Sequence, residues 1–180
     1  MGYESGNINI GEGDLLMKAP GDNDFVDAGG CRDASLDIKQ KDLQIKIGQV
    51  LGAVDQYIID QEVGFSILMV ESTLRNLCIA SGISPEEIDT SDPNTDKLKI
   101  YGNAVQSVNF MELKYEVPRI HDKTKKIRFI FTRVKAKGTF KVDFNNDKEW
   151  IFKLDCMAFP DPNSDPQWLT MEVQYDKIAA

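Results

Sequence analysis

Residues 34–70 alternate polar and apolar side chains over an unusual length, and this pattern constrains the fold more than any other. Leu36 and Ile38 are apolar in a first run, and Leu43 and Ile45 are apolar in a second. An apolar tip, Val50–Val54, precedes an apolar return run. A period of two predicts a long β-hairpin. Because one domain cannot bury such a tip by itself, we expect the hairpin to be completed by neighbouring subunits.

The alternation slips by one residue at Lys41-Asp42. A slip within a period of two predicts a β-bulge at that point. The return side consists of residues 57–59 and 63–70. The second of these is apolar on both faces, which predicts a central strand buried on both sides.

A short helix is expected at residues 73–82, with Ser72 as its N-cap and Gly82 as its end. Its predicted apolar stripe is Leu74, Leu77, Cys78 and Ser81. Residues 84–88, which begin Ser-Pro-Glu-Glu, predict a single helical turn. Loops are expected at 18–30, 89–96 and 160–166, and further strands at 7–17, 108–117, 127–136, 139–144, 150–158 and 169–175.

These elements predict a mainly β fold, a β-sandwich or barrel with one flanking α-helix. At 180 residues with 42% hydrophobic content, the chain is long enough for one globular domain over residues 1–180. We divide it into an N-terminal arm, residues 1–33, an inter-subunit hairpin loop at about 41–60, and the remaining sheet.

Charge and cysteine content exclude several classes of protein. The formal net charge of −8 is opposite to that of a protein that grips phosphates. The three cysteines are far apart and include no CxxC pair, which argues against a disulfide framework or zinc ribbon. We expect Cys78 and Cys156 to be buried as small hydrophobic residues. Without an apolar run of bilayer length or a signal-peptide pattern, a cytoplasmic product is expected.

Candidate catalytic and metal residues are few. His121 is the one histidine, and without a G-x-S-x-G elbow an exposed loop histidine is favoured over a catalytic triad. Asp161, Asn163, Asp165 and Glu172 have calcium-loop spacing, but Pro166 stands where glycine is required, so a stiffened turn is favoured. Asp92, Asn94 and Asp96 match that spacing less well. A glycosidase-type carboxylate pair stays possible by count, with no pair singled out.

Two basic segments, residues 123–126 and 135–141, stand out in an acidic chain. The simpler interpretation of each is a solvated loop face. The more specific interpretation is pairing with an acidic patch on a neighbouring copy of the chain.

The layout resembles the tail tube proteins of tailed bacteriophages, especially the long non-contractile type. The resemblance is carried by Asp27-Ala28-Gly29-Gly30, by residues 48–54, by Glu71–Leu77, and by Phe144–Asp147 leading to a strand that exits at Ala158–Pro162. It implies a tail-tube-type β-sandwich, homohexameric rings stacked into a hollow tube, and delivery of the genome through that tube. It therefore implies a structural virion protein with no enzymatic activity, cofactor or metal.

The resemblance also implies the contacts. The inter-subunit residues would be Gln49, Val50, Leu51, Gly52, Ala53, Val54 and Tyr57. The implied partners are copies of the chain, a tape measure protein inside the tube, and tail terminator and distal tail proteins, with no membrane contact. DNA would pass through an acidic bore without specific binding.

Two alternatives to a tail tube subunit remain open at this point. The first is another ring-forming component, such as a tail terminator, a distal tail protein, or a contractile or type VI secretion tube protein. The second is a carbohydrate-binding module or hydrolase on a β-sandwich, because a fold does not determine a function.

Overall fold

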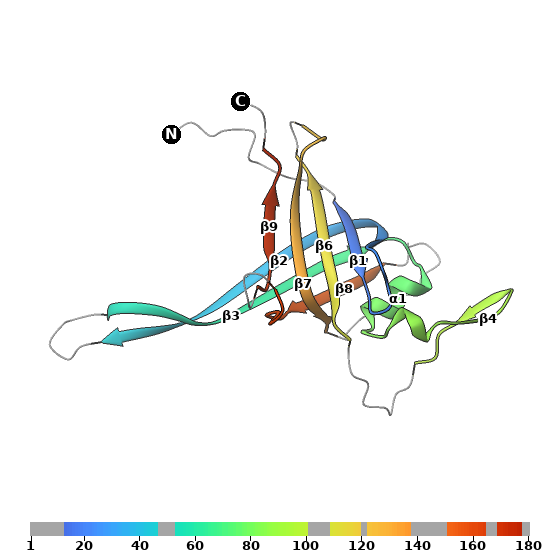
Figure 1. Cartoon of the computed structure of the whole chain (residues 1–180), viewed down its shortest axis with the longest axis horizontal. Helices are drawn as coiled ribbons and strands as arrows, with labels where there is room; N and C mark the ends of the chain where they lie inside the picture. The colour runs from blue at the N-terminus through green and yellow to red at the C-terminus, as the bar shows by residue number, and fades with distance from the viewer. Residues whose placement is uncertain are drawn as a thin grey trace.

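Antiparallel strands dominate the computed structural model, which describes residues 13–46, 53–100, 109–119, 122–137, 151–164 and 169–177. These residues form nine strands, one α-helix and one 3-10 turn (Figure 1). The strands are β1 (Asp14–Lys18), β2 (Val26–Lys46), β3 (Ala53–Met69), β4 (Asp89–Asp92), β5 (Thr95–Lys97), β6 (Met111–Pro118), β7 (Lys126–Ala136), β8 (Phe152–Ala158) and β9 (Glu172–Tyr175). The helix is α1 (Leu74–Ala80), and the 3-10 turn is η2 (Pro85–Glu87).

Strand pairing closes the main sheet on itself. Its order is β6-β1-β2-β3-β8-β7-β9, and β6 also pairs with β7. Six strands therefore form a ring of hydrogen-bonded neighbours, and β9 is added beside the first half of β7. Figure 1 shows β1, β6, β7 and β9 crossing over β2, β3 and β8, so the two halves enclose the core as layers. The predicted mainly β sandwich or barrel with one helix is confirmed.

Alternating residues from both layers fill the core. In β6, Met111, Leu113, Tyr115 and Val117 are buried, and in β8, Phe152, Leu154, Cys156 and Ala158 are buried, as their alternation predicts. The Phe65 ring packs between the layers, with its centroid 5.6 Å from that of Tyr115 and 5.4 Å from that of Phe131. Aromatic pairs at this separation stabilise a core beyond simple area burial.

β3 is central, as predicted, because it pairs with β2 on one edge and β8 on the other. The prediction that β3 is buried on both faces is only partly correct. Ile67 and Met69 are fully buried, whereas Leu68 and Val70 on the outer face are partly exposed.

The predicted loops and strand limits need correction in several places. The expected loop at 18–30 is shorter, because β2 already begins at Val26 and pairs with β1. Residues 14–18 and 26–33 of the proposed N-terminal arm thus lie in the sheet. The expected acidic loop at 89–96 is a small hairpin, β4–β5. The last strand, β9, covers only residues 172–175 of the expected 169–175. Residues 139–144 lie outside the described residues.

The helix forms where expected, with a different cap and a different buried face. Thr73, not Ser72, is the N-cap, and its side chain accepts a hydrogen bond from the Asn76 amide at 3.1 Å. Gly82 follows the helix with a φ of +75°, a conformation that favours glycine. The buried residues are Asn76, Cys78, Ile79 and Ala80, and Leu77 packs partly buried against the core, so the predicted stripe is correct at Leu77 and Cys78 and misses Asn76, Ile79 and Ala80.

Asn76 is buried because it ties the helix to the sheet. Its side-chain nitrogen donates to the carbonyl oxygens of Ala28, at 2.8 Å, and Glu71, at 2.9 Å. Arg75, on the same helix, makes a two-pronged contact with Asp22, the shorter prong at 2.6 Å. These contacts fix α1 beside β8.

Candidate functional site

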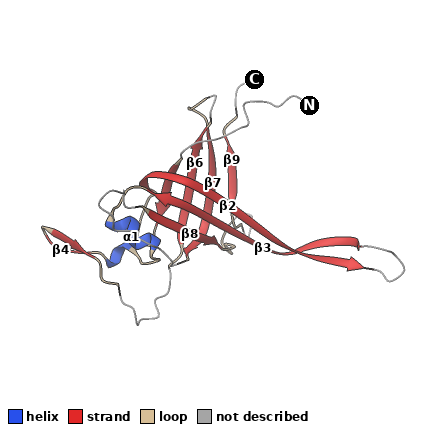
Figure 2. Cartoon of the chain, turned by 180° about the vertical axis from the view of Figure 1, so that it is seen from behind, coloured by secondary structure: helices blue, strands red, loops and turns tan. Residues whose placement is uncertain are grey.

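The outer parts of β2 and β3 leave the closed sheet as a two-stranded ribbon, which we define as residues 35–46 and 53–62. Their pairing continues to Lys46 opposite Ala53, while β1 and β8 contact only the inner parts of the two strands. At about 3.3 Å per residue, the 12 residues from 35 to 46 reach about 40 Å. Figures 1 and 2 show the ribbon projecting from the sheet on the side opposite the β4–β5 hairpin.

A bulge marks the place where the ribbon leaves the sheet. Arg32 pairs with Leu68 and Ser35 with Ser66, so two residues of β2, Asp33 and Ala34, stand opposite one residue of β3. Asp33 has a φ of +54°, a left-handed conformation that aspartate tolerates better than most side chains. Bulges increase local twist and bend the bulged strand. The ribbon direction is therefore set by defined backbone geometry.

The ribbon exposes apolar side chains along its whole length. Seven large ones are between 38% and 58% exposed: Leu36, Ile38, Leu43, Ile45, Tyr57, Ile58 and Ile59. Every described side chain of residues 35–45 and 55–62 except these is polar or charged, and all are exposed. Removing a half-exposed side chain of this size from water stabilises an assembly by on the order of 1 kcal/mol. A contiguous apolar surface of this kind marks an interaction site in a soluble protein.

Both faces of the ribbon carry apolar residues. Leu36 pairs with Phe65 and Ile38 with Val63, so the core face of the sheet continues onto the start of the ribbon. Pairing on β2 is unbroken from residue 35 to 45, so strict alternation puts Leu43 and Ile45 on the opposite face. A ribbon with this distribution is buried only when something covers it on both sides.

The predicted bulge lies where expected but on the other strand. Lys41 pairs with Asp60 and Asp42 with Ile58, so Ile59 of β3 is the extra residue. The phase change at Lys41-Asp42 therefore means that the apolar residues of β2 lie on one face of the ribbon before this point and on the opposite face after it.

The inter-subunit residues predicted from the sequence can be placed only in part. Gln49, Val50, Leu51 and Gly52 lie outside the described residues. Ala53 and Val54 belong to the β3 backbone, and nothing is described of their side chains. Tyr57 is 53% exposed and stands directly opposite Leu43, and its hydrogen bond with Asp55 raises the pKa of the phenol. The exposed residues Leu43, Ile45, Ile58 and Ile59 were not named among the predicted contacts, although they lie within the inter-subunit loop predicted at about 41–60.

β9 exposes apolar residues of a similar kind. Val173 pairs with Phe129 and Tyr175 with Ile127, so both continue the inner face of the other layer. They are 40% and 60% exposed. Inner-face residues of both layers, Leu36 and Ile38 on β2 and these two on β9, thus remain open to solvent.

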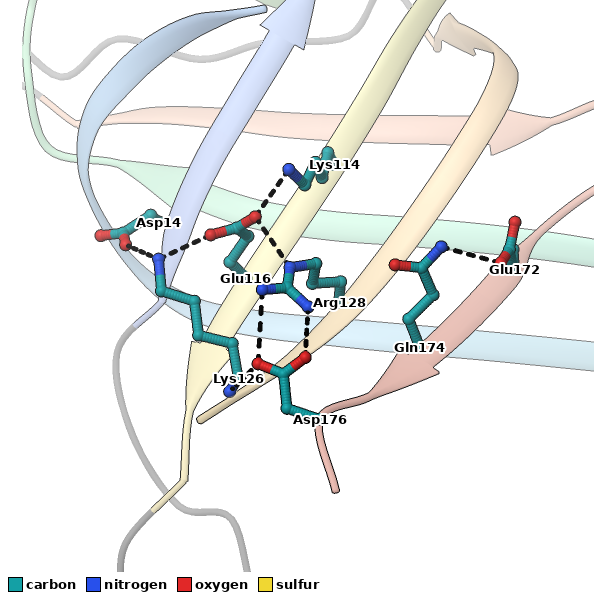
Figure 3. Close-up of polar contacts among 8 residues, drawn as sticks. All are labelled: Asp14, Lys114, Glu116, Lys126, Arg128, Glu172, Gln174 and Asp176. Carbon is teal, nitrogen blue, oxygen red and sulfur yellow. Dashed lines mark hydrogen bonds and ion pairs between the residues drawn. The ribbon is translucent and has the colours of Figure 1, made fainter. Parts of the chain in front are cut away.

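A network of charges on the outer face ties four strands together (Figure 3). Glu116 is buried and accepts contacts from Lys126 at 2.6 Å, Lys114 at 2.7 Å and Arg128 at 3.3 Å. Burial alone would raise its pKa, but the hydrogen bonds and charges of Lys114 and Lys126 outweigh it and lower the pKa to about 2. Glu116 is therefore a structural anion at neutral pH.

The same network holds the C-terminal strand. Arg128 forms a fork with Asp176, through contacts of 2.7 Å and 3.3 Å. The Asp176 side chain also accepts a hydrogen bond from the Lys126 amide, and its carbonyl accepts one from Arg119. Three carboxylates, including Asp14, thus lie among four cations, Lys114, Lys126, Arg128 and Arg119. The arrangement fastens β9 to β6 and β7.

The predicted catalytic and metal candidates do not assemble into a site within the described part of the chain. His121 and Asp165 lie outside it. Asp161 accepts a hydrogen bond from the Asn163 amide, as in a surface turn, and Glu172 contacts Gln174. Asp92 likewise caps the Asn94 amide in the β4–β5 turn. Among the described residues, no three His, Cys, Asp or Glu side chains are grouped to hold a metal ion.

The cysteines are buried and free, as predicted for Cys78 and Cys156. Burial, supported by the nearby Asp27 charge, raises the pKa of Cys31 to about 11, and burial raises that of Cys156 to about 12. All three thiols are protonated at neutral pH, a state that makes them poor nucleophiles.

The carboxylates Asp37 and Asp155 line a shallow polar hollow on the outer face, beside hydrogen-bonded Ser35 and Ser66. Each is paired, Asp37 with Lys39 and Asp155 with Lys153. This hollow therefore offers no free acid and base pair.

Comparison with known proteins adds no family. No protein-family model and no curated protein matches the chain. Within the described residues, no helix has the length and apolar character needed to cross a bilayer.

Proposed function

We propose that this chain is a structural subunit that assembles with copies of itself through the ribbon. The observation that carries the proposal is the set of seven half-exposed apolar side chains on a two-stranded extension of a closed sheet. An isolated ribbon of two strands is marginally stable in water. Contact with neighbouring copies removes that cost and covers the apolar faces.

The geometry favours a ring over a two-fold dimer. The ribbon projects from one side of the molecule (Figure 2), and both of its faces carry exposed apolar side chains that a contact at its tip alone would leave uncovered. A ribbon that reaches a different surface on the next copy makes a heterologous contact, and such contacts close into rings when the rotation allows. The exposed inner-face residues of β9, Val173 and Tyr175, provide an apolar surface for such a contact.

The form of assembly that we propose is the one implied by the resemblance to bacteriophage tail tube proteins. In it, homohexameric rings stack into a hollow tube of the virion, through which the genome is delivered. The net charge of −8 supports a bore in which DNA slides, because phosphates are not held by an acidic wall. A ring-forming tail component that does not stack is the alternative within the same class.

Assembly as a function of concentration tests the proposal. Sedimentation velocity should show oligomers above a threshold concentration, and negative-stain microscopy should show rings or tubes. The ribbon variant Leu43→Asp/Tyr57→Lys replaces a directly paired apolar couple and leaves the net charge unchanged. We expect it to remain monomeric under conditions in which the wild type assembles.

The matched control is Gln40→Asp/Gln61→Lys, which makes the same new pair at a polar position of the same ribbon. It should assemble like the wild type. A wild type that stays monomeric at millimolar concentration contradicts the proposal. Rings that never stack favour the alternative tail component.

A further inference from the structure

The two basic segments of the sequence have different environments in the structure. In the first, Lys126 is neutralised by Glu116 and Asp14. In the second, Lys135 and Lys137 make no ion pair with any carboxylate of the described residues, and neither does Arg133 just before the segment, although each has other contacts. Within the described part of the chain, these three cations therefore form a concentration of positive charge without ion pairs, although Lys137 lines the outer hollow together with Asp37 and Asp155.

These cations are gathered on an aromatic support. The Arg133 guanidinium lies 3.8 Å from the centroid of the Phe110 ring, and the Lys135 ammonium lies 4.3 Å from it. Phe110 packs edge-on against Phe159, with centroids 5.6 Å apart. Cation–π contacts orient the two charges side by side but do not neutralise them. We call Phe110, Arg133, Lys135, Lys137 and Phe159 the basic patch.

An acidic segment projects elsewhere on the molecule. Residues 86–97, which we call the acidic arm, comprise η2 after Pro85 and the β4–β5 hairpin. They hold five acidic side chains, Glu86, Glu87, Asp89, Asp92 and Asp96, and one cation, Lys97, which already pairs with Asp92. Figures 1 and 2 show the hairpin extending away from the sheet.

The hairpin of the arm is small and exposed. Its strands have four and three residues, with mainly exposed side chains, and a two-stranded hairpin of that size is marginal in water. Like charges gathered in the arm repel one another, as do those in the basic patch. One contact between the two surfaces relieves both repulsions, and the β4–β5 hairpin points away from the sheet of its own copy (Figure 1).

We propose that the basic patch binds the acidic arm of a second copy of the chain. This inference rests on the proposed self-assembly and adds a second, electrostatic contact to the apolar contact of the ribbon. Complementary charges of this kind set partner orientation and association rate, and they weaken as salt screens them.

Charge reversal with rescue tests the contact. The patch variant is Lys135→Glu/Lys137→Glu, and the arm variant is Glu87→Lys/Asp96→Lys. They change the net charge by equal and opposite amounts, at side chains that are exposed or half-exposed. Each alone should raise the concentration needed for assembly at least tenfold at low ionic strength in sedimentation velocity. An equimolar mixture of the two should recover to within about threefold of the wild type, because each reversed surface then meets a complementary one.

The control Lys123→Glu/Lys125→Glu makes the same charge change outside the patch. The concentration that it needs for assembly should stay within threefold of that of the wild type. Circular dichroism of each variant checks that it is folded. If the mixture assembles no better than either variant alone, or if the control is equally impaired, the inference is wrong.

Other outcomes separate this inference from the proposed function. If the ribbon variant fails to assemble while both charge variants assemble normally, the inference fails and the proposed function stands. If the wild type does not assemble at all, both fail. If a single-stranded oligodeoxynucleotide binds the wild type and not the patch variant, and no rescue is seen, the patch binds nucleic acid and the inference is overturned.

Discussion

Leu43 stands directly opposite Tyr57 in the ribbon, and both side chains are more than half exposed, at 52% and 53%. A cross-strand apolar pair normally stabilises a sheet by packing against a covered face. Here that face is open, so the pair contributes little to the isolated chain.

The ribbon variant Leu43→Asp/Tyr57→Lys should therefore change the free energy of unfolding of the monomer by less than about 1 kcal/mol, as for other exposed positions. Opposite charges placed directly across the strands preserve the pairing. Urea denaturation of wild type and variant at a concentration below assembly measures this. A loss of several kcal/mol would mean that the pair supports the fold of the single chain.

The pKa of Glu116, lowered to about 2, predicts a loss of stability in acid. A carboxyl group whose pKa is lower in the folded state than its ordinary 4.5 stabilises the fold fully above about pH 5. That contribution declines as the pH falls from about 5 toward 2. The free energy of unfolding, measured in urea at pH 7, 5 and 3, should fall across this window.

Glu116→Gln should reduce stability at pH 7 by about 1–3 kcal/mol, because it removes charge-assisted hydrogen bonds and leaves the partly exposed cations Lys114, Lys126 and Arg128 less well paired. It should also flatten the pH dependence between 5 and 3 compared with the wild type. Glu112→Gln, which removes a more exposed partner of Lys18, is the matched control and should cost under 1 kcal/mol. An unchanged acid profile in Glu116→Gln would assign the acid sensitivity to other carboxylates.

The long hairpin was predictable from the sequence because its signal is repetitive. Alternation over many residues has one structural solution, and the phase change at Lys41-Asp42 located the bulge. The identity of the extra residue was not predictable. Tyr57, Ile58 and Ile59 are apolar in succession, so the sequence does not show which of them faces which side of the strand.

Features that depend on contacts between distant segments escaped prediction. Glu116 meets Arg128 because β6 and β7 pair in one register, which no local pattern specifies. Asn76 was placed outside the helix stripe because it is polar, yet two backbone carbonyls satisfy it in the core. The β4–β5 hairpin was taken for a loop because its strands are acidic, although Asp92-Pro93-Asn94 is a favourable turn sequence.

The cysteines predict slow labelling of the folded chain. Because the thiolate is the reactive form and the pKa values of Cys31 and Cys156 are about 11 and 12, few thiolates exist at pH 8. Reaction with Ellman's reagent should be at least a hundredfold slower in native buffer than in 8 M urea. The urea sample should release three equivalents, matching the three cysteines of the chain. Rapid release of one equivalent from the native protein would show that a thiol becomes accessible.

Asn76→Ala should destabilise the chain strongly although it changes a single polar residue. The substitution removes the buried hydrogen bond to the Ala28 carbonyl oxygen and a second, partly buried one to the Glu71 carbonyl oxygen, which keeps a donor in the Thr73 amide. Unsatisfied buried acceptors cost about 1–3 kcal/mol each, so a loss of about 2–4 kcal/mol is expected in urea denaturation.

Arg75→Ala, at the preceding position of α1, is the matched control. It removes an ion pair with Asp22 whose side chains are 25% and 20% exposed, and a partly exposed pair contributes about 1 kcal/mol or less. Arg75→Ala should therefore cost clearly less than Asn76→Ala. Equal losses would mean that α1 is attached to the sheet mainly through Asp22, and not through the buried amide that joins the helix to β2.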